Sequence, residues 1–181
     1  MDEARLPPHD TRRRVFEAVH RFPGLGAAQL GRLTGESASL VDYHLDALDA
    51  AGLVVLVKDE SVRRASGARL ARRLGEKRLL MLGLMREKVP FQVLLVALGQ
   101  ATPVHHGELA ESVQVAKSTL TYHLDKLVAR GILLRIAKGP GKGYRVAERE
   151  VVHALFCDHL PTPEMMDTYG SLWLDLYRRP L

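Results

Sequence analysis

The chain contains one stretch of sequence twice, and this duplication constrains the fold more than any other feature. The first copy runs from Gln29 to Leu53 and the second from Glu108 to Ile132, aligned without a gap at an offset of 79 positions. Nine of the 25 aligned positions are identical, whereas average residue usage gives about two by chance. The chain is therefore expected to build the same small unit twice.

Each copy is centred on a helix. Apolar residues recur at i, i+4 and i+7, as at Val41, Leu45 and Leu48, and this spacing predicts a helix with one buried stripe. Gly52 and Gly131 follow the two stripes, where a residue without a Cβ ends a helix at the lowest cost. The stripe and its glycine together predict where both long helices end.

Further elements surround each central helix. After each glycine the pattern becomes extended, which predicts a β-hairpin. Before each central helix, apolar spacing predicts a short helix and an earlier, longer one. These runs cover residues 12–21, 29–34 and 53–57 in the first copy and 91–99, 108–113 and 132–136 in the second.

Helix, helix, turn, helix and hairpin is the order of a winged helix-turn-helix. Val115–Leu133 resembles the recognition-helix signature of ArsR/MarR-like prokaryotic regulators, and Glu36–Val54 is a second, looser match. The resemblance covers about 55 residues of each copy and none of the C-terminal tail. It implies a mainly α fold with small β-hairpin wings (α+β), with two tandem winged helix-turn-helix domains.

The remaining segments complete a five-part organisation. The C-terminal tail carries enough apolar side chains either to pack on the repeats or to form a homodimer, and the sequence leaves both open. The expected parts are an N-terminal arm (1–10), winged-helix repeat 1 (11–65), a helical connector (66–87), winged-helix repeat 2 (88–147) and a helical tail (148–181).

Charge is distributed unevenly over these parts. The formal net charge is +5. Residues 10–67 are neutral, residues 68–87 carry +4, residues 88–147 carry +5 and residues 148–181 carry −3. Basic segments suit a polyanionic partner. Double-stranded DNA is therefore expected to bind chiefly to the second repeat.

The family pattern implies a set of DNA-contacting residues in repeat 2. Lys, Ser, Thr and Tyr side chains can donate to base edges or phosphates. The resemblance places a histidine at the DNA-facing edge of the helix, although a partly buried structural histidine is an equal alternative. The candidates are Lys117, Ser118, Thr121, Tyr122 and His123 on the helix and Arg135, Lys138, Lys142 and Arg145 on the wing.

Repeat 1 offers a less basic version of this surface. Its outward positions, by the same resemblance, are Ser37, Ala38, Ser39, Asp42 and Tyr43, and Ser37 is expected to cap the helix. His44 is the family histidine of this copy, at the DNA-facing edge or, equally, a partly buried structural residue. Asp42 stands at a reading position, and the expected wing tip, Asp59-Glu60, is acidic. Repeat 1 therefore either reads DNA weakly or contacts a protein.

Three consecutive arginines, Arg12, Arg13 and Arg14, open the first helix. Their guanidinium groups at a helix N-terminus suit a backbone phosphate. A plain solvated run is the alternative interpretation.

Other function classes lack their signatures. The chain has no Gly-rich phosphate loop, no metal-spaced cluster and no recognisable nucleophile–base pair, so neither an enzyme nor a cofactor is expected. His105-His106 is expected to be a plain surface pair, and one cysteine excludes an internal disulfide. The absence of a long apolar run or a signal peptide predicts a cytoplasmic protein with no membrane contact. The expected DNA binding would associate it with the nucleoid.

These observations favour a DNA-binding transcriptional regulator. Two alternatives remain at this stage. A nucleoid or chromatin protein could bind with little sequence preference through charge alone. A winged-helix scaffold in chromosome or transcription machinery would instead use the folds to contact other proteins.

Overall fold

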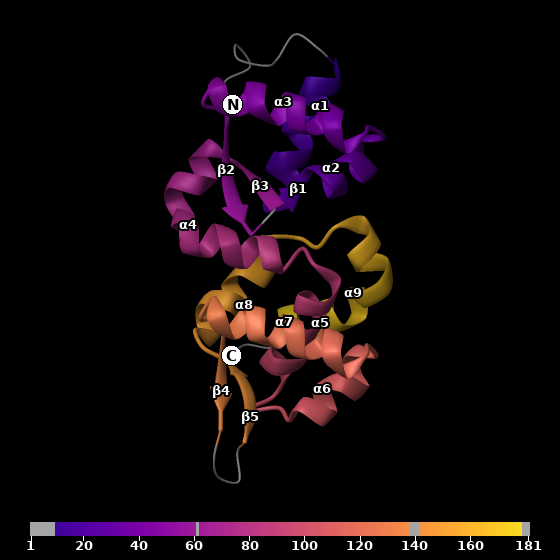
Figure 1. Cartoon of the computed structure of the whole chain (residues 1–181), viewed down its shortest axis with the longest axis vertical. Helices are drawn as coiled ribbons and strands as arrows, with labels where there is room; N and C mark the ends of the chain where they lie inside the picture. Colours follow the sequence, from indigo (N-terminus) through magenta and orange to yellow (C-terminus); the bar gives the residue numbers. More distant parts are fainter. Residues whose placement is uncertain (1–9, 61, 138–141, 179–181) are drawn as a thin grey trace. The chain divides into compact units, whose positions relative to one another are not determined.

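The computed structural model describes residues 10–60, 62–137 and 142–178. Over these ranges the chain is mainly helical with small antiparallel hairpins, the α+β class that the sequence predicts. It divides into two compact units, Met1–Gly83 (unit 1) and Leu84–Leu181 (unit 2), which Figure 1 shows in the colours of the sequence.

Unit 1 combines helices with a three-stranded antiparallel sheet of order β1-β3-β2. Its core is apolar and draws on the helices and the sheet alike, with Val15, Val19, Leu30, Leu45, Leu48 and Val54 buried. The elements are α1 (Asp10–Arg21), β1 (Leu25–Gly26), α2 (Ala27–Thr34), α3 (Ala38–Ala50), β2 (Val54–Asp59), β3 (Val62–Gly67) and α4 (Ala68–Leu84), whose last residue begins unit 2.

Unit 2 has the same order of three helices and a hairpin, and it ends in two helices where unit 1 ends in one. Leu94, Leu98, Leu109, Leu120 and Leu124 are fully or almost fully buried. The elements are α5 (Lys88–Gly99), α6 (His106–Val113), α7 (Lys117–Ala129), β4 (Leu133–Ile136), β5 (Gly143–Val146), α8 (Arg149–Asp158) and α9 (Pro163–Arg178).

The offset of 79 holds in the backbone as well as in the sequence. Helices α2 and α6 begin and end at equivalent residues, and so do α3 and α7. The pair Leu25–Ala65 between β1 and β3 corresponds to the bridge Val104–Tyr144. The predicted stop at Gly52 has φ of 67°, and its equivalent Gly131 has φ of 66°.

The short helices begin two residues earlier than their apolar pattern predicts. Gly26 and His105 precede them in extended conformation. Their amides donate to the side chains three residues on, Gly26 to Gln29 at 3.2 Å and His105 to Glu108 at 3.0 Å. This bond from the amide before the helix to the third helical side chain extends the first turn beyond the apolar stripe. The opening helices likewise begin early, at Asp10 and Lys88.

The turn between α2 and α3 and the turn between α6 and α7 both contain a left-handed residue, which is a glycine only in unit 1. Gly35 has φ of 75° and its equivalent Gln114 has φ of 54°. The left-handed region costs a residue with a Cβ about 1–2 kcal/mol, and glycine's extra chain entropy offsets about 0.5–1 kcal/mol of that.

Gln114→Gly should therefore raise the free energy of unfolding of unit 2 by about 0.5–1 kcal/mol. Urea unfolding of the full chain, followed by circular dichroism, measures the change. Gln114→Ala is the control, because it removes the amide group but keeps the Cβ. Equal stabilities for the two variants would contradict the strain argument.

Helix α4 covers the outer face of the unit 1 hairpin (β2 and β3). Ala71 and Leu79 of α4 are buried against Val57, and Leu74 packs at the edge of this cluster. Figure 1 shows α4 beside the two strands. The hairpin is therefore an internal layer of its unit and not a projecting wing.

The prediction that Asp59 and Glu60 form an exposed acidic wing tip is wrong for Asp59. Strand β2 extends through Asp59, which is only 1% exposed and lies 3.5 Å from the guanidinium of Arg64, itself 3% exposed. A Cβ at Gly83 of α4 would overlap the Arg64 side chain. The glycine in α4 thus leaves room for a buried ion pair beneath the helix.

The connector predicted at 66–87 is helical over most of its length but not uniform. Ser66 and Gly67 complete β3, and Gly75 interrupts α4 with φ of 74° and ψ of 166°. Arg86, which contributes to the +4 charge of residues 68–87, is buried in unit 2 and donates to the carbonyl of Leu160. Burial lowers the pKa of Arg86 to about 10.

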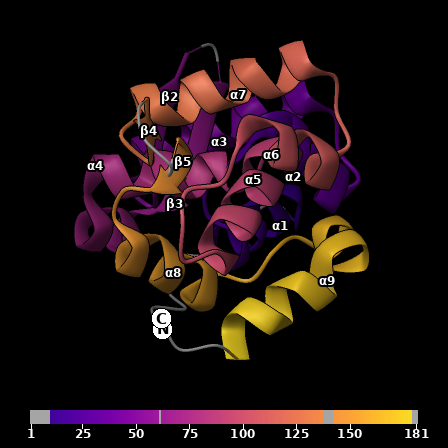
Figure 2. The ribbon, with the colours of Figure 1, turned by 90° about the horizontal axis from the view of Figure 1, so that it is seen from below.

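The tail packs on unit 2 through one face of α9. Trp173 Nε1 donates to the carbonyl of Phe156 at 3.0 Å, and Tyr169 lies against the ring of Phe91. Leu172, Leu174 and Tyr177 remain exposed on the same helix. Figure 2 shows α9 (yellow) along the outer edge of its unit. Packing thus buries Met165, Tyr169, Trp173 and Leu176 and leaves the other three exposed.

Candidate nucleic-acid interface

Helix α7 has a clear division between a core face and a solvent face. Leu120, Leu124 and Leu127 are completely buried. On the opposite side the sequence candidates Lys117, Ser118, Thr121 and Tyr122 are all exposed, Tyr122 by 54%. The structure therefore brings these four side chains together on one surface.

The first turn of α7 is uncapped by any side chain. Its N-cap is Ala116, whereas the equivalent helix α3 is capped by Ser37, whose hydroxyl accepts from the amide of Leu40 at 3.2 Å. The first amides of a helix need acceptors, and a phosphate oxygen supplies one. The uncapped amides beside Lys117 therefore favour an anion at the start of α7. At the start of α3, the hydroxyl of Ser37 already fills this role.

His106, which the sequence predicts to be one of a plain surface pair, contacts a candidate residue of α7. Its Nε2 lies 3.1 Å from the hydroxyl of Thr121, which itself donates to the carbonyl of Lys117 at 2.8 Å. The hydroxyl of Thr121 is therefore held in place by two neighbours. Its methyl group remains the part best suited to touch a base.

The two family histidines face inward, which corrects their placement at the DNA-facing edge. His44 is 7% exposed. His123 is half-buried, with Nδ1 3.9 Å from Glu87, and Glu87 accepts from Lys126 at 3.2 Å. Burial is the main cause that lowers the pKa of His123, followed by Lys126, with Glu87 opposing.

The unit 2 hairpin (β4 and β5) carries exposed cations. Lys142 and Arg145 are exposed. Arg135 is ion-paired to Asp125 of α7 and lies 5.5 Å from the centre of the Tyr144 ring, so it braces the hairpin against the helix. Lys138, a further candidate, lies outside the described residues together with the Gly-Pro-Gly segment that follows it.

The equivalent surface of unit 1 is tied up by internal ion pairs. Arg63 of β3 donates to Asp42 at 2.7 Å and also to Asp46, and these bonds, Asp46 first, raise the pKa of Arg63. Asp42, which the sequence places at a reading position, is therefore already paired with Arg63. Ser39 is exposed, and Tyr43 is 63% exposed.

Of the three arginines that open α1, two are already partnered by acids. Arg13 lies between Asp10 and Glu17, and Arg14 bonds Glu36. Arg14 also donates to the carbonyl of Thr34, so it ties α1 to the α2–α3 turn. To hold a phosphate, these guanidinium groups would have to exchange carboxylate partners. Arg12 is half-buried.

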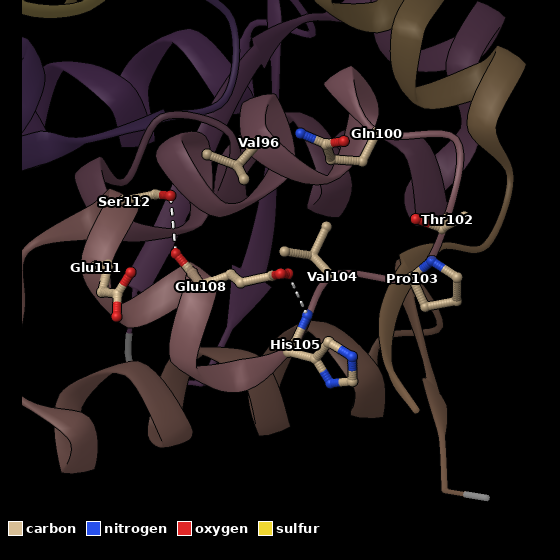
Figure 3. Close-up of a pocket in the computed structure, with 9 residues that line it drawn as sticks. All are labelled: Val96, Gln100, Thr102, Pro103, Val104, His105, Glu108, Glu111 and Ser112. Carbon is tan, nitrogen blue, oxygen red and sulfur yellow. Dashed lines mark hydrogen bonds between the residues drawn. The ribbon is translucent and has the colours of Figure 1, made fainter. Parts of the chain in front are cut away.

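A pocket of about 750 Å³ lies between α5 and α6, away from this surface. Figure 3 shows Glu108 and Glu111 on one wall and Val104 and Pro103 on the loop opposite. Glu108 is occupied by the cap of α6, since it accepts from the His105 amide. No residue of α7 or of the hairpin lines the pocket, so the interface does not include it.

Part of unit 2 matches a known family. Residues 92–138 match the sequence model of the MarR family. The matched stretch includes α6, α7 and β4, so a MarR family winged-helix domain lies in unit 2, as the resemblance implies. At the level of the family, this supports a winged-helix DNA-binding transcriptional regulator. No curated protein matches the chain.

Two further observations bear on other function classes. No helix in the described ranges is long and apolar enough to cross a membrane. Within the same ranges, no three His, Cys, Asp or Glu side chains are grouped in a way that could hold a metal ion.

Proposed function

We propose that the chain is a transcriptional regulator that reads duplex DNA mainly through α7 of unit 2. The observation that carries this proposal is the exposed face of α7, where Lys117, Ser118 and Tyr122 lie beside an uncapped helix start. The one acidic residue of α7, Asp125, is already paired to Arg135. An α-helix with such a face fits the major groove.

Each side chain has a role that follows from its chemistry. Lys117 donates to guanine O6 and N7 or to a phosphate, and Ser118 donates to either. Tyr122 donates to a phosphate or contacts a thymine methyl. Lys142 and Arg145 of the hairpin hold the neighbouring backbone, and Lys138 is assigned the same role from sequence alone.

Unit 1 is proposed as a second winged-helix repeat that arose by duplication. The matching helix limits and strand pairs at the offset of 79 support this assignment. Two readers on one chain can span adjacent half-sites about one helical turn apart. The proposed parts are the arm 1–10, repeat 1 at 11–65, the connector 66–87, repeat 2 at 88–147 and the tail 148–181.

A second candidate function for unit 1 is contact with another protein, as in a scaffold. The observation that favours it is the set of exposed apolar side chains, Leu33, Leu40, Tyr43 and Val62. At the positions equivalent to Leu33 and Leu40, unit 2 has the hydroxyl residues Ser112 and Thr119. The candidates differ in one result, because Tyr43→Ala weakens DNA binding only if unit 1 reads DNA.

A homodimer through the tail is a further part of the proposal. Leu172, Leu174 and Tyr177 of α9 are apolar side chains that the packing on unit 2 leaves exposed. Exposed apolar side chains suit a second copy, which would double the number of readers per complex. A regulator of this kind is expected in the cytoplasm, associated with the nucleoid.

A salt series of binding tests the function. Fluorescence anisotropy with random-sequence and genomic duplexes should give affinities that fall linearly with the logarithm of salt concentration, because bound phosphates release counterions. Genomic fragments that bind far more tightly than random DNA identify a sequence-specific regulator. Uniform affinity identifies a nucleoid protein, and absence of binding at low salt rejects the DNA-binding proposal.

A further inference from the structure

Helix α4 carries a group of exposed arginines that the interface on α7 does not use. In the arm before the Gly75 kink, Ala71 packs inward against the hairpin. The other side of the arm is exposed at Arg69, Arg72 and Arg73, and Arg78 is exposed beyond the kink. We name these four residues the α4 arginine face.

The α4 arginine face is not neutralised by the rest of the described chain. None of its four residues is ion-paired with a carboxylate among the described residues. Arg63 and Arg64 of the same unit are, by contrast, bound to acids. Arg13 and Arg14 are likewise bound to acids. The other exposed arginines of the described part of unit 1, Arg21 and Arg32, stand singly on separate helices.

The spacing of this face disfavours the helix that carries it. Arg69 lies three and four residues before Arg72 and Arg73, so all three project from the same side, and like charges at these spacings destabilise a helix. The first turn of α4 contains no acid, and a cation there opposes the helix dipole. A bound polyanion relieves both penalties at once.

The position of the face also matters. In unit 1 the outer face of the hairpin is covered by α4, so the hairpin cannot meet DNA with that face. The surface presented in its place is the α4 arginine face. Arg69 and Arg73 are about 6 Å apart along a helix axis, and guanidinium groups bind phosphate oxygens in pairs. The surface thus suits a chain of phosphates.

We propose that the α4 arginine face is a second DNA-contacting surface, which binds the phosphate backbone of the duplex without reading its sequence. This rests on the proposed function, since it requires that the chain bind DNA. It assigns a role to four of the six basic residues within 68–87. Unit 1 would then add affinity through α4, even where α3 contributes none.

The test compares two double variants of the full chain. Arg72→Gln/Arg73→Gln removes two charges from the face, and Arg21→Gln/Arg32→Gln removes two exposed charges from α1 and α2. Each lost phosphate contact lowers the salt slope by about 0.9. The α4 variant should therefore lose about 2 in slope, while its preference among DNA sequences stays unchanged. The control should keep the wild-type slope.

Arg72→Lys/Arg73→Lys should restore most of the slope, which separates lost charge from a misfolded helix. The inference is overturned if both double variants lose the same slope, or if the α4 variant loses none. In either case the proposed function still stands, provided that the wild type binds DNA. Failure of the wild type to bind DNA overturns both. Selective loss of binding to anionic lipid vesicles, with the DNA slope unchanged, overturns it in favour of a membrane surface.

Discussion

Asp59→Ala should lower the free energy of unfolding of unit 1 by about 3–5 kcal/mol, because it leaves the buried guanidinium of Arg64 without its ion-pair partner. A typical domain is stable by only about 5–15 kcal/mol, so the loss is large. Urea unfolding of the full chain should show the unit 1 transition at a much lower midpoint. The transition of unit 2 should stay in place.

The neighbouring acid provides the control. Glu60 is exposed, so Glu60→Ala should cost much less stability than Asp59→Ala. Asp59→Leu/Arg64→Met removes both charges and should recover most of the loss, since apolar replacement of a buried pair is often neutral or stabilising. Small and equal effects of the two single alanine variants would instead indicate an exposed acidic tip.

The ion pair illustrates what the sequence does not reveal. The offset of 79, the stripes and the glycine stops predict the helices and hairpins because each depends on residues close together in the chain. The burial of Asp59 depends on α4 folding back, which brings Gly83 against Arg64. No local pattern contains that contact. A glycine within a leucine-rich helix, as at Gly83, is a sign of close packing. The sequence does not show which side chain packs against it.

The candidate site divides in the same way. Exposure of Lys117, Ser118 and Tyr122 follows from the helical period, which puts them opposite the leucine stripe. The inward placement of His44 does not follow from the helical period, because this period puts His44 at the boundary between the buried and exposed faces of α3. The bonds of Arg63 to Asp42 and of His106 to Thr121 join different elements. They could be found only once the hairpin and helices were placed.

Lys117→Ala/Tyr122→Ala should weaken DNA binding by about 100-fold. A good contact to a base edge is worth about 1–3 kcal/mol, and about 1.4 kcal/mol corresponds to a tenfold change in affinity. Contributions from separate side chains add when the residues do not touch. Each single alanine variant should therefore lose about tenfold, as measured by anisotropy at fixed salt on the tightest genomic duplex.

Unit 1 supplies a matched control for this loss. Tyr43 occupies the position equivalent to Tyr122 and is at least as exposed, at 63% against 54%. The residue before Tyr43, however, is the acidic Asp42, which is paired to Arg63. The residue before Tyr122 is the uncharged Thr121. If unit 2 is the reader, Tyr43→Ala changes affinity by less than about twofold. Equal losses at the two tyrosines would mean that both units engage the duplex, and would exclude protein contact as the sole role of α3.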